Sequence, residues 1–194
     1  MSGYSMVSVP KKGDNPGMPV GKKNILIIFD FDQVETYIRD EKSVTITSFA
    51  MKTGKTPIGL FIDEGSFDAG DNVEGDNYAR GFVHYVNGDH PGTELEVAEF
   101  KGHNVNANLG AIVVACDPSV TTCKVYGTPC APLKMQAGNE QDAKDKHANH
   151  FEFKAEQRTY PVGIMAKSLI PETDNAEINA YLGIPVQVAN PGDL

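Results

Sequence analysis

An acidic, glycine-rich segment, residues 63–79, contains most of the oxygen ligands that could bind a cation. Its six carboxylates are Asp63, Glu64, Asp68, Asp71, Glu74 and Asp76. Carboxylates and backbone carbonyls are the ligands that Ca²⁺ prefers. The spacing lacks the Asp-x-Asp-x-Asp-Gly order of an EF-hand loop, and the segment shows no apolar periodicity. We therefore expect a long, solvated loop that projects from the body of the protein.

A pair of histidines, His147-x-x-His150, lies close to Asp142 and Asp145. Zinc hydrolases place two histidines at i and i+4 of a helix, with a glutamate between them. The pair here is spaced differently and lies in a polar stretch that precedes a strand. We therefore expect no metal site at these residues.

Three cysteines, at positions 116, 123 and 130, are the next candidates for chemistry. Their number is odd and too small for a disulfide framework, and their even spacing matches no zinc ribbon or finger. They lack a recognisable Cys-His signature. We predict reduced, half-buried cysteines in a protein made in a reducing cytoplasm.

The segment Thr53-Gly54-Lys55-Thr56 partly matches a phosphate-binding loop. The position of the required earlier glycine is occupied by Phe49, and the following Pro57-Ile-Gly is typical of a strand. A phosphate-binding loop needs the N-terminus of a helix immediately after it. We therefore expect an ordinary turn.

The segment that begins at Ile27 and contains Asp30-x-Asp32-x-Val34-x-Thr36 resembles motif I of haloacid-dehalogenase-type phosphatases. The resemblance implies that Asp30 is a nucleophile and Asp32 an acid/base, both next to Mg²⁺. Ser48 and the pair Gly70-Asp71 would then stand for later motifs. That fold needs helices between parallel strands, and the sequence predicts none between residues 30 and 93. We therefore expect a strand followed by a charged turn.

The elements around these residues are predicted to be mainly strands. Nineteen Gly and twelve Pro interrupt the chain, which favours short strands and turns. Hydrophobic alternation and apolar runs predict eight or so strands. They lie at residues 24–29 (extended to about 37), 43–49, 57–62, 81–87, 109–116, 123–126, 149–156 and 162–166, the last pair as partners. We expect a turn at 87–92 and a loop at 136–150.

Two short helices are predicted from capping boxes. Thr93-x-x-Glu96 predicts a helix from Glu94 to about Lys101 that ends at Gly102. Asp174-x-x-Glu177 predicts a second helix near the C-terminus that ends at Gly183. Its apolar residues at i, i+3 and i+4 must pack against another part of the protein.

Composition limits the class of function. The net charge is −9, with 26 acidic and 17 basic residues. An acidic surface disfavours tight binding of nucleic acid but suits a channel through which DNA slides. The first 22 residues lack the apolar core of a signal peptide, and we predict a flexible arm there. The longest apolar runs are too short to span a bilayer, so no membrane partner is expected.

Several phrases of the sequence resemble structural tail proteins of phages that infect Bacteroides-like bacteria. They are Glu74-Gly-Asp to Gly81-Phe, His90-Pro-Gly, Glu96 to Phe100, Asn106 to Val113 and Tyr126 to Leu133. The resemblance covers about residues 24–165. It implies a tail-tube-like β-sandwich or barrel with one flanking helix. It also implies assembly into stacked, hexameric rings, and it transfers no catalytic residue and no cofactor.

The sequence thus predicts a mainly β, non-enzymatic virion subunit in three parts. Residues 1–22 form the arm, 23–166 the tail-tube-like β domain, and 167–194 a C-terminal extension with a short helix. The expected partners are copies of the chain and other virion tail proteins, with genome DNA passing without specific binding. A neck ring, a tail terminator, a capsid decoration or glycan-binding protein, and a Mg²⁺-dependent phosphatase using Asp30 and Asp32 remain alternatives. The loop at 63–79 remains open as a cation site.

Overall fold

The computed structural model of the chain describes Ser8 and residues 21–144 and 146–184. Nearly all of the predicted arm, residues 1–22, lies outside the described residues, as does the end of the predicted extension beyond residue 184. The described strands are β1 (Lys22–Asp30), β2 (Val34–Arg39), β3 (Thr45–Met51), β4 (Ile58–Phe61), β5 (Asp68–Glu74), β6 (Gly81–Pro91), β7 (Leu109–Ala115), β8 (Thr122–Tyr126), β9 (Leu133–Ala143), β10 (Lys146–Ala155) and β11 (Gly163–Ala166). The α-helices are α1 (Leu95–Asn104) and α2 (Ala176–Leu182).

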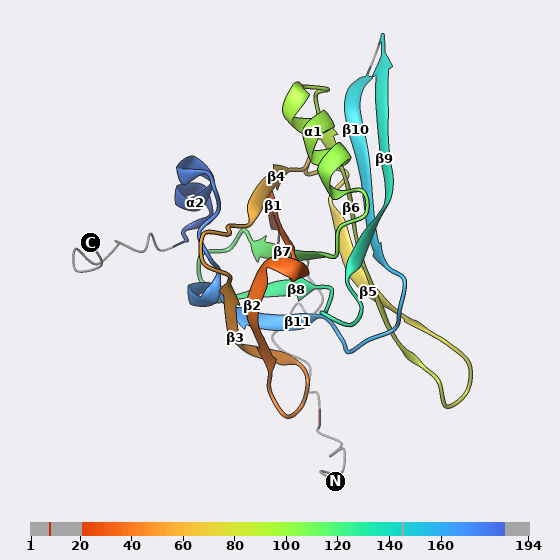
Figure 1. The fold of residues 1–194 in the computed structure, drawn as a ribbon, viewed down its shortest axis with the longest axis vertical. Helices are drawn as coiled ribbons and strands as arrows, with labels where there is room; N and C mark the ends of the chain where they lie inside the picture. The colour runs from red at the N-terminus through yellow and green to blue at the C-terminus, as the bar shows by residue number, and fades with distance from the viewer. Residues whose placement is uncertain (1–7, 9–20, 145, 185–194) are drawn as a thin grey trace, which may run out of the picture.

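The described strands form one large mixed sheet, which confirms the predicted mainly β class with two short helices (Figure 1). The strand order is β2-β3-β11-β8-β7-β9-β10-β6-β5. β1 pairs with β4 on one side and with β7 on the other. β3 and β11 run parallel, and the other described pairs are antiparallel. The predicted pairing of 162–166 with 149–156 is wrong, because β11 pairs with β8 and β3.

The β1–β7 pair lies at the centre of the molecule and is buried on both faces. Successive side chains of a strand point to opposite sides. Leu26 and Ile28 of β1 therefore join one apolar cluster, and Ile27 and Phe29 join another. Leu26 and Ile27 are completely buried. Full burial of each such side chain contributes about 1.5–3 kcal/mol, so this pair anchors both halves of the core.

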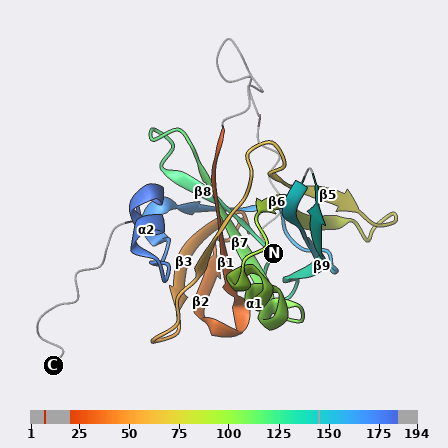
Figure 2. The same ribbon diagram turned by 90° about the horizontal axis from the view of Figure 1, so that it is seen from above.

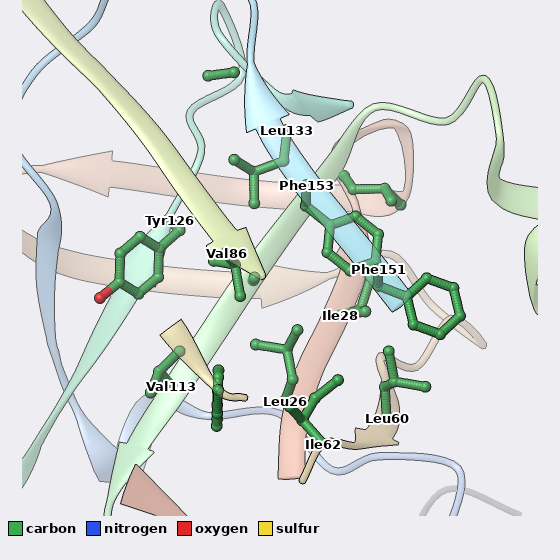
Figure 3. Packing of buried hydrophobic residues seen from close by; sticks show 14 of the residues in the cluster. Leu26, Ile28, Leu60, Ile62, Val86, Val113, Tyr126, Leu133, Phe151 and Phe153 are labelled. Atoms are coloured by element: carbon green, nitrogen blue, oxygen red, sulfur yellow. The ribbon is translucent and has the colours of Figure 1, made fainter. Parts of the chain in front are cut away.

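The first cluster lies between the β1–β7 pair and the sheet β9-β10-β6-β5. Phe151 and Phe153 of β10 point toward Leu26, Ile28 and Leu60 (Figure 3). Phe100 of α1 packs edge-on against both rings. Helix α1 therefore covers one face of β10, as the predicted flanking helix should.

The second cluster lies on the other face of the β1–β7 pair, against β3, β8 and β11. The segment after β11 contributes Ile170, Leu182 and Ile184 to it. Helix α2 lies on the opposite side of the molecule from β5 and β9 (Figure 2). Asn175 caps this helix by accepting hydrogen bonds from the backbone N–H groups of Glu177 and Ile178. Gly183 ends the helix in a left-handed conformation, as predicted.

Two predicted loops are strands. Residues 68–74, within the predicted loop 63–79, form β5, which pairs with β6 along its whole length. The described part of residues 136–150, predicted as a polar loop, belongs to the long β9–β10 hairpin. Both hairpins extend beyond the body of the molecule (Figure 1). Their tips carry no apolar alternation because neither face is buried there.

The predicted turn at 87–92 is also wrong, because β6 continues through Gly88 to Pro91. A Cβ atom at Gly88 would lie 2.3 Å from Cγ2 of Ile62. This glycine therefore allows close packing within a strand and does not mark a turn.

The capping predictions need two corrections. Helix α1 begins at Leu95 after Glu94, without a side-chain cap from Thr93. It continues through Gly102 to Asn104, because Gly102 does not adopt the left-handed conformation with which glycine commonly ends a helix. The cap of α2 is Asn175 and not Asp174.

Candidate functional site

Several of the described strands have an edge that pairs with no other described strand. β2, β4 and β5 each bond to one neighbour only. β9 bonds to β10 along its length, but to β7 only at Leu109 and Leu133. Free N–H and C=O groups on such edges can pair with another strand. The described structure therefore offers surfaces for strand addition at both ends of its strand order, at β2 and at β5.

A groove of about 510 Å³ lies beside β4 and between α1 and α2. Apolar side chains line it, among them Ile58, Phe61, Phe100 and Ile178, and Phe61 is 40% exposed. Three exposed carboxylates stand in its lining: Glu94, Glu96 and Asp174. They come from the start of α1 and from the segment before α2. The groove therefore combines an apolar floor with an acidic rim.

The edge of β4 that is not bonded to β1 faces this groove. In an antiparallel pair, alternate residues direct their main-chain groups to the partner. The N–H of Ile62 donates to Asn24 O at 2.7 Å. By this alternation, the main-chain N–H and C=O groups of Leu60 and Ile58 also point toward β1. The main-chain groups of Gly59 and Phe61 then point away from β1. His90 Nδ1 donates to Phe61 O at 2.9 Å, which occupies one of the outward groups.

The β5–β6 hairpin carries a strained aromatic residue at its tip. Tyr78 has a φ angle of 69° and a fully exposed side chain. A left-handed backbone at a residue other than glycine, asparagine or aspartate is uncommon. Arg158 Nη1 holds the turn by donating to Ala79 O at 2.6 Å. The tip of the hairpin is therefore fixed by a hydrogen bond and exposes an aromatic side chain to solvent.

The β9–β10 hairpin is attached to the body by a buried polar group. Asn149 is completely buried on β10. Its Nδ2 donates to Gly92 O at 2.8 Å, and its Oδ1 accepts from Lys101 Nζ at 2.6 Å. Lys101 also pairs with Glu140 of β9 at 3.0 Å. These contacts join the hairpin to α1 and to the end of β6.

His84 is the one completely buried histidine among the described residues. Its Nδ1 accepts from the N–H of Gly127 at 2.8 Å, so Nε2 carries the proton and donates to Tyr160 O at 2.9 Å. Burial lowers the pKa of His84 below its ordinary 6.5, and Arg39 lowers it further, while Asp71 and the bond to Tyr160 oppose this. Both nitrogens are bonded within the core, so His84 has a structural role.

Asp30 and Asp32 lie at the end of β1, but the structure does not give them the phosphatase arrangement. β1 is antiparallel to both of its neighbours. Asp30 accepts a hydrogen bond from the N–H of Asp32 at 2.9 Å, and Asp32 lies 3.3 Å from Asn108 Nδ2. Ser48 lies on β3 and Asp71 on β5, near opposite ends of the strand order. The residues of the supposed motifs are therefore not brought together.

The remaining candidates for chemistry are also dispersed. Residues 53–56 form a turn before β4 with no helix after them. His147 pairs with Asp142 and His150 with Asp89, each at 2.6 Å, and their i, i+3 spacing on a strand places them on opposite faces. Asp145 lies outside the described residues.

The carboxylates of residues 63–79 are used separately. Asp63 Oδ2 accepts from the N–H of Gly65 at 3.1 Å, and Asp71 Oδ2 accepts from the N–H of Val162 at 3.2 Å. Glu74 pairs with Lys154 at 3.5 Å. Across the described part of the chain, His, Cys, Asp and Glu side chains form no group of three that could hold a metal ion.

The three cysteines are free, but only one is in the core. Cys123 is buried, and burial raises the pKa of its thiol to about 12. Cys116 and Cys130 are exposed, which corrects the prediction that all three are half-buried. Cys116 follows β7 and Cys130 lies in the turn after β8, where neighbouring strands no longer cover them.

Comparison of the chain with protein-family models, with curated proteins and with solved structures found no match. Neither described helix has the length and apolar character needed to cross a membrane. The groove beside β4 was not predicted from the sequence. Its residues come from four separate segments, and only the acidic start of α1 could have suggested it.

Proposed function

We propose that this chain is a structural subunit of a phage tail tube or a related virion ring, and that it acts by self-assembly and not by catalysis. The observation that supports this most directly is the sheet with unpaired strands at both ends of its order, β2 and β5. In natural monomers such edges are usually covered, shortened or blocked.

Unlike edges at the two ends of one sheet suit a head-to-tail contact between copies. Such a contact is heterologous, and it closes into a ring when its rotation divides a full turn. The two projecting hairpins then provide surfaces for contact with the next ring. We propose rings that stack, with hexamers as the expected order, and with other virion tail proteins as further partners.

The charge of the chain is compatible with a channel for DNA. With a net charge of −9, a lumen lined by this protein would repel phosphates and bind DNA weakly. The proposal therefore includes passage of the genome without specific binding. We propose that the protein is located in the virion after its synthesis in the cytoplasm of the bacterial host.

Electron microscopy with negative stain and sedimentation velocity test this proposal. Concentrated wild-type protein should form rings or tubes, and the sedimentation coefficient should rise with concentration. A single monomeric species at every concentration, with and without other tail proteins, would overturn the proposal. Single rings that never stack would instead indicate a neck ring or a tail terminator.

A further inference from the structure

We propose that the acid-rimmed groove beside β4 binds residues 4–12 of a second copy of this chain. The inference rests on the proposed self-assembly and identifies the site at which one copy holds the next. Three properties of the groove support it: its floor, its rim and the strand edge that it contains.

The floor of the groove needs an apolar occupant. Phe61 is 40% exposed although it belongs to a strand that packs on the core, and Ile178 and Phe100 are only partly buried. Each 100 Å² of apolar surface covered here would contribute about 2.5 kcal/mol before the entropy of binding is subtracted. An occupant with several apolar side chains would gain most from this surface.

The rim needs a basic occupant. Glu94, Glu96 and Asp174 are all exposed, and His90 is the only side chain among the lining residues that can carry positive charge. His90 lies 3.8 Å from Glu94. The carboxylates of Glu96 and Asp174, from α1 and from the segment before α2, therefore attract cations from both sides of the groove.

Residues 4–12, Tyr-Ser-Met-Val-Ser-Val-Pro-Lys-Lys, have both properties. Tyr4, Met6, Val7 and Val9 are apolar, and Lys11 and Lys12 follow directly. The first acidic residue of the chain is Asp14. An apolar stretch that ends in two lysines is complementary to an apolar floor with carboxylates at its rim.

The strand edge adds main-chain contacts. An extended segment can add to an exposed edge strand, where main-chain hydrogen bonds provide affinity and side-chain pockets provide specificity. β4 presents the outward groups of Gly59 to the groove, and Phe61 N–H beside them, whereas the outward carbonyl of Pro57, just before β4, already accepts from the N–H of Asp174 at 3.2 Å. Pro10 lacks an N–H group, so strand pairing would stop before it. The two lysines would then lie beyond the paired residues, toward one side of the acidic rim.

A charge-reversal mixing experiment tests this proposal. The arm variant Lys11→Glu/Lys12→Glu and the groove variant Glu96→Lys/Asp174→Lys should each fail to form tubes. Mixed together, they should form tubes, because the acidic arm of one fits the basic groove of the other. Glu99→Lys is the matched control, since Glu99 lies on α1 outside the groove lining, and it should assemble as the wild type does.

The outcomes separate the two proposals. If wild-type protein forms tubes and the groove variant forms them equally well, the groove proposal is wrong and the proposed function stands. If the wild type remains monomeric, the proposed self-assembly is wrong. A second copy is then also ruled out as the occupant of the groove. If mixing has no effect but the quadruple variant alone regains wild-type behaviour, each copy binds its own segment, and the proposal of a second copy is overturned.

A peptide experiment measures the contact without tubes. A labelled peptide of residues 1–13 should bind the arm variant, whose own segment is mismatched, in fluorescence anisotropy. Adding Glu96→Lys/Asp174→Lys to that protein should weaken binding at least about tenfold, and adding Glu99→Lys should change it much less. Binding should also weaken with salt, because exposed charges are screened. Equal affinity for all three proteins would overturn the proposal.

Discussion

The β1–β7 pair and the β9–β10 hairpin have the same strand geometry but are stabilised in different ways. β1 and β7 are buried on both faces, with Ile27 and Ile112 completely buried. The outer half of the β9–β10 hairpin has polar residues on both faces, and its attachment depends on Asn149 and Lys101. Apolar burial specifies the first pair, whereas main-chain pairing and a few polar contacts specify the second.

This difference indicates that the β1–β7 pair mainly stabilises the fold, whereas the solvated faces of the β9–β10 hairpin can contact other molecules. A central strand that lost an apolar side chain would weaken the cluster to which that side chain belongs. A hairpin whose faces are solvated can change its surface with little effect on the core. Substitutions in the two regions should therefore differ in size and in the property that they change.

Ile27→Ala should have the largest effect on stability. Ile27 is completely buried in the second cluster, and removal of three carbon atoms leaves a cavity between β1 and its neighbours. We expect the free energy of unfolding to fall by about 2–5 kcal/mol, measured by urea denaturation. Ile38→Ala on β2, where the side chain is 53% exposed, is the control and should change it by less than about 0.5 kcal/mol. Similar losses in both variants would contradict the central role of β1.

Asn149→Ala should have an intermediate effect, confined to the attachment of the hairpin. It leaves Gly92 O without its donor and Lys101 without one acceptor. An unsatisfied buried group costs about 1–3 kcal/mol, and we expect a loss of this size in urea denaturation. Asn139→Ala, at an exposed position of β9, is the matched control and should be nearly neutral. If hydrogen exchange of the hairpin amides is unchanged in Asn149→Ala, the contacts of Asn149 do not attach the hairpin to the body of the protein.

His84 should make stability depend on pH. Its pKa is lowered in the folded protein, so the unfolded chain binds a proton more readily. The contribution of neutral His84 to stability is then fully present above the unfolded pKa of 6.5. It is lost as the pH falls below 6.5 toward the lowered pKa of the folded protein. The difference in unfolding free energy between wild type and His84→Gln should therefore shrink from pH 7.5 to pH 5. Exposed histidines contribute equally to both proteins and cancel in this difference. A constant difference would contradict the prediction.

The part of the fold that could be predicted from sequence is the part that apolar burial specifies. The runs Ile25–Phe29 and 109–114 contain too many apolar residues to be anything but buried, and both are central strands. Helix α2 was found because its apolar spacing and Gly183 agree. β5 was missed because its sequence, DAGDNVE, has no buried face of its own and depends on β6 for its strand conformation.

The candidate groove could not be predicted, because its parts are far apart in the sequence. Ile58 and Phe61 look like ordinary strand residues, and Glu94 and Asp174 look like residues at helix starts. Only the packing of α1 and α2 on either side of β4 brings them together. The motif-like pairs failed for the opposite reason, since residues close in sequence, such as His147 and His150, lie on opposite faces of a strand.

Val73→Pro should have the smallest effect on the folded monomer and a large effect on assembly. Phe82 exchanges main-chain hydrogen bonds with Thr159, at 3.0 and 2.8 Å, so it directs these groups away from β5. Val73 is paired with Phe82, and its own N–H must then point outward from the sheet. Proline at this position removes no hydrogen bond from the monomer, and edge strands tolerate it.

We expect this substitution to change the free energy of unfolding by less than about 1 kcal/mol, because Val73 is 60% exposed and makes no core contact. A strand from another copy could no longer bond to the middle of this edge, so rings and tubes should be lost in electron microscopy. Val73→Thr, which keeps the N–H and the branched side chain, should assemble normally. If Val73→Pro forms tubes like the wild type, the contact between copies does not use the edge of β5, and the open edge of β2 must then pair with a different surface.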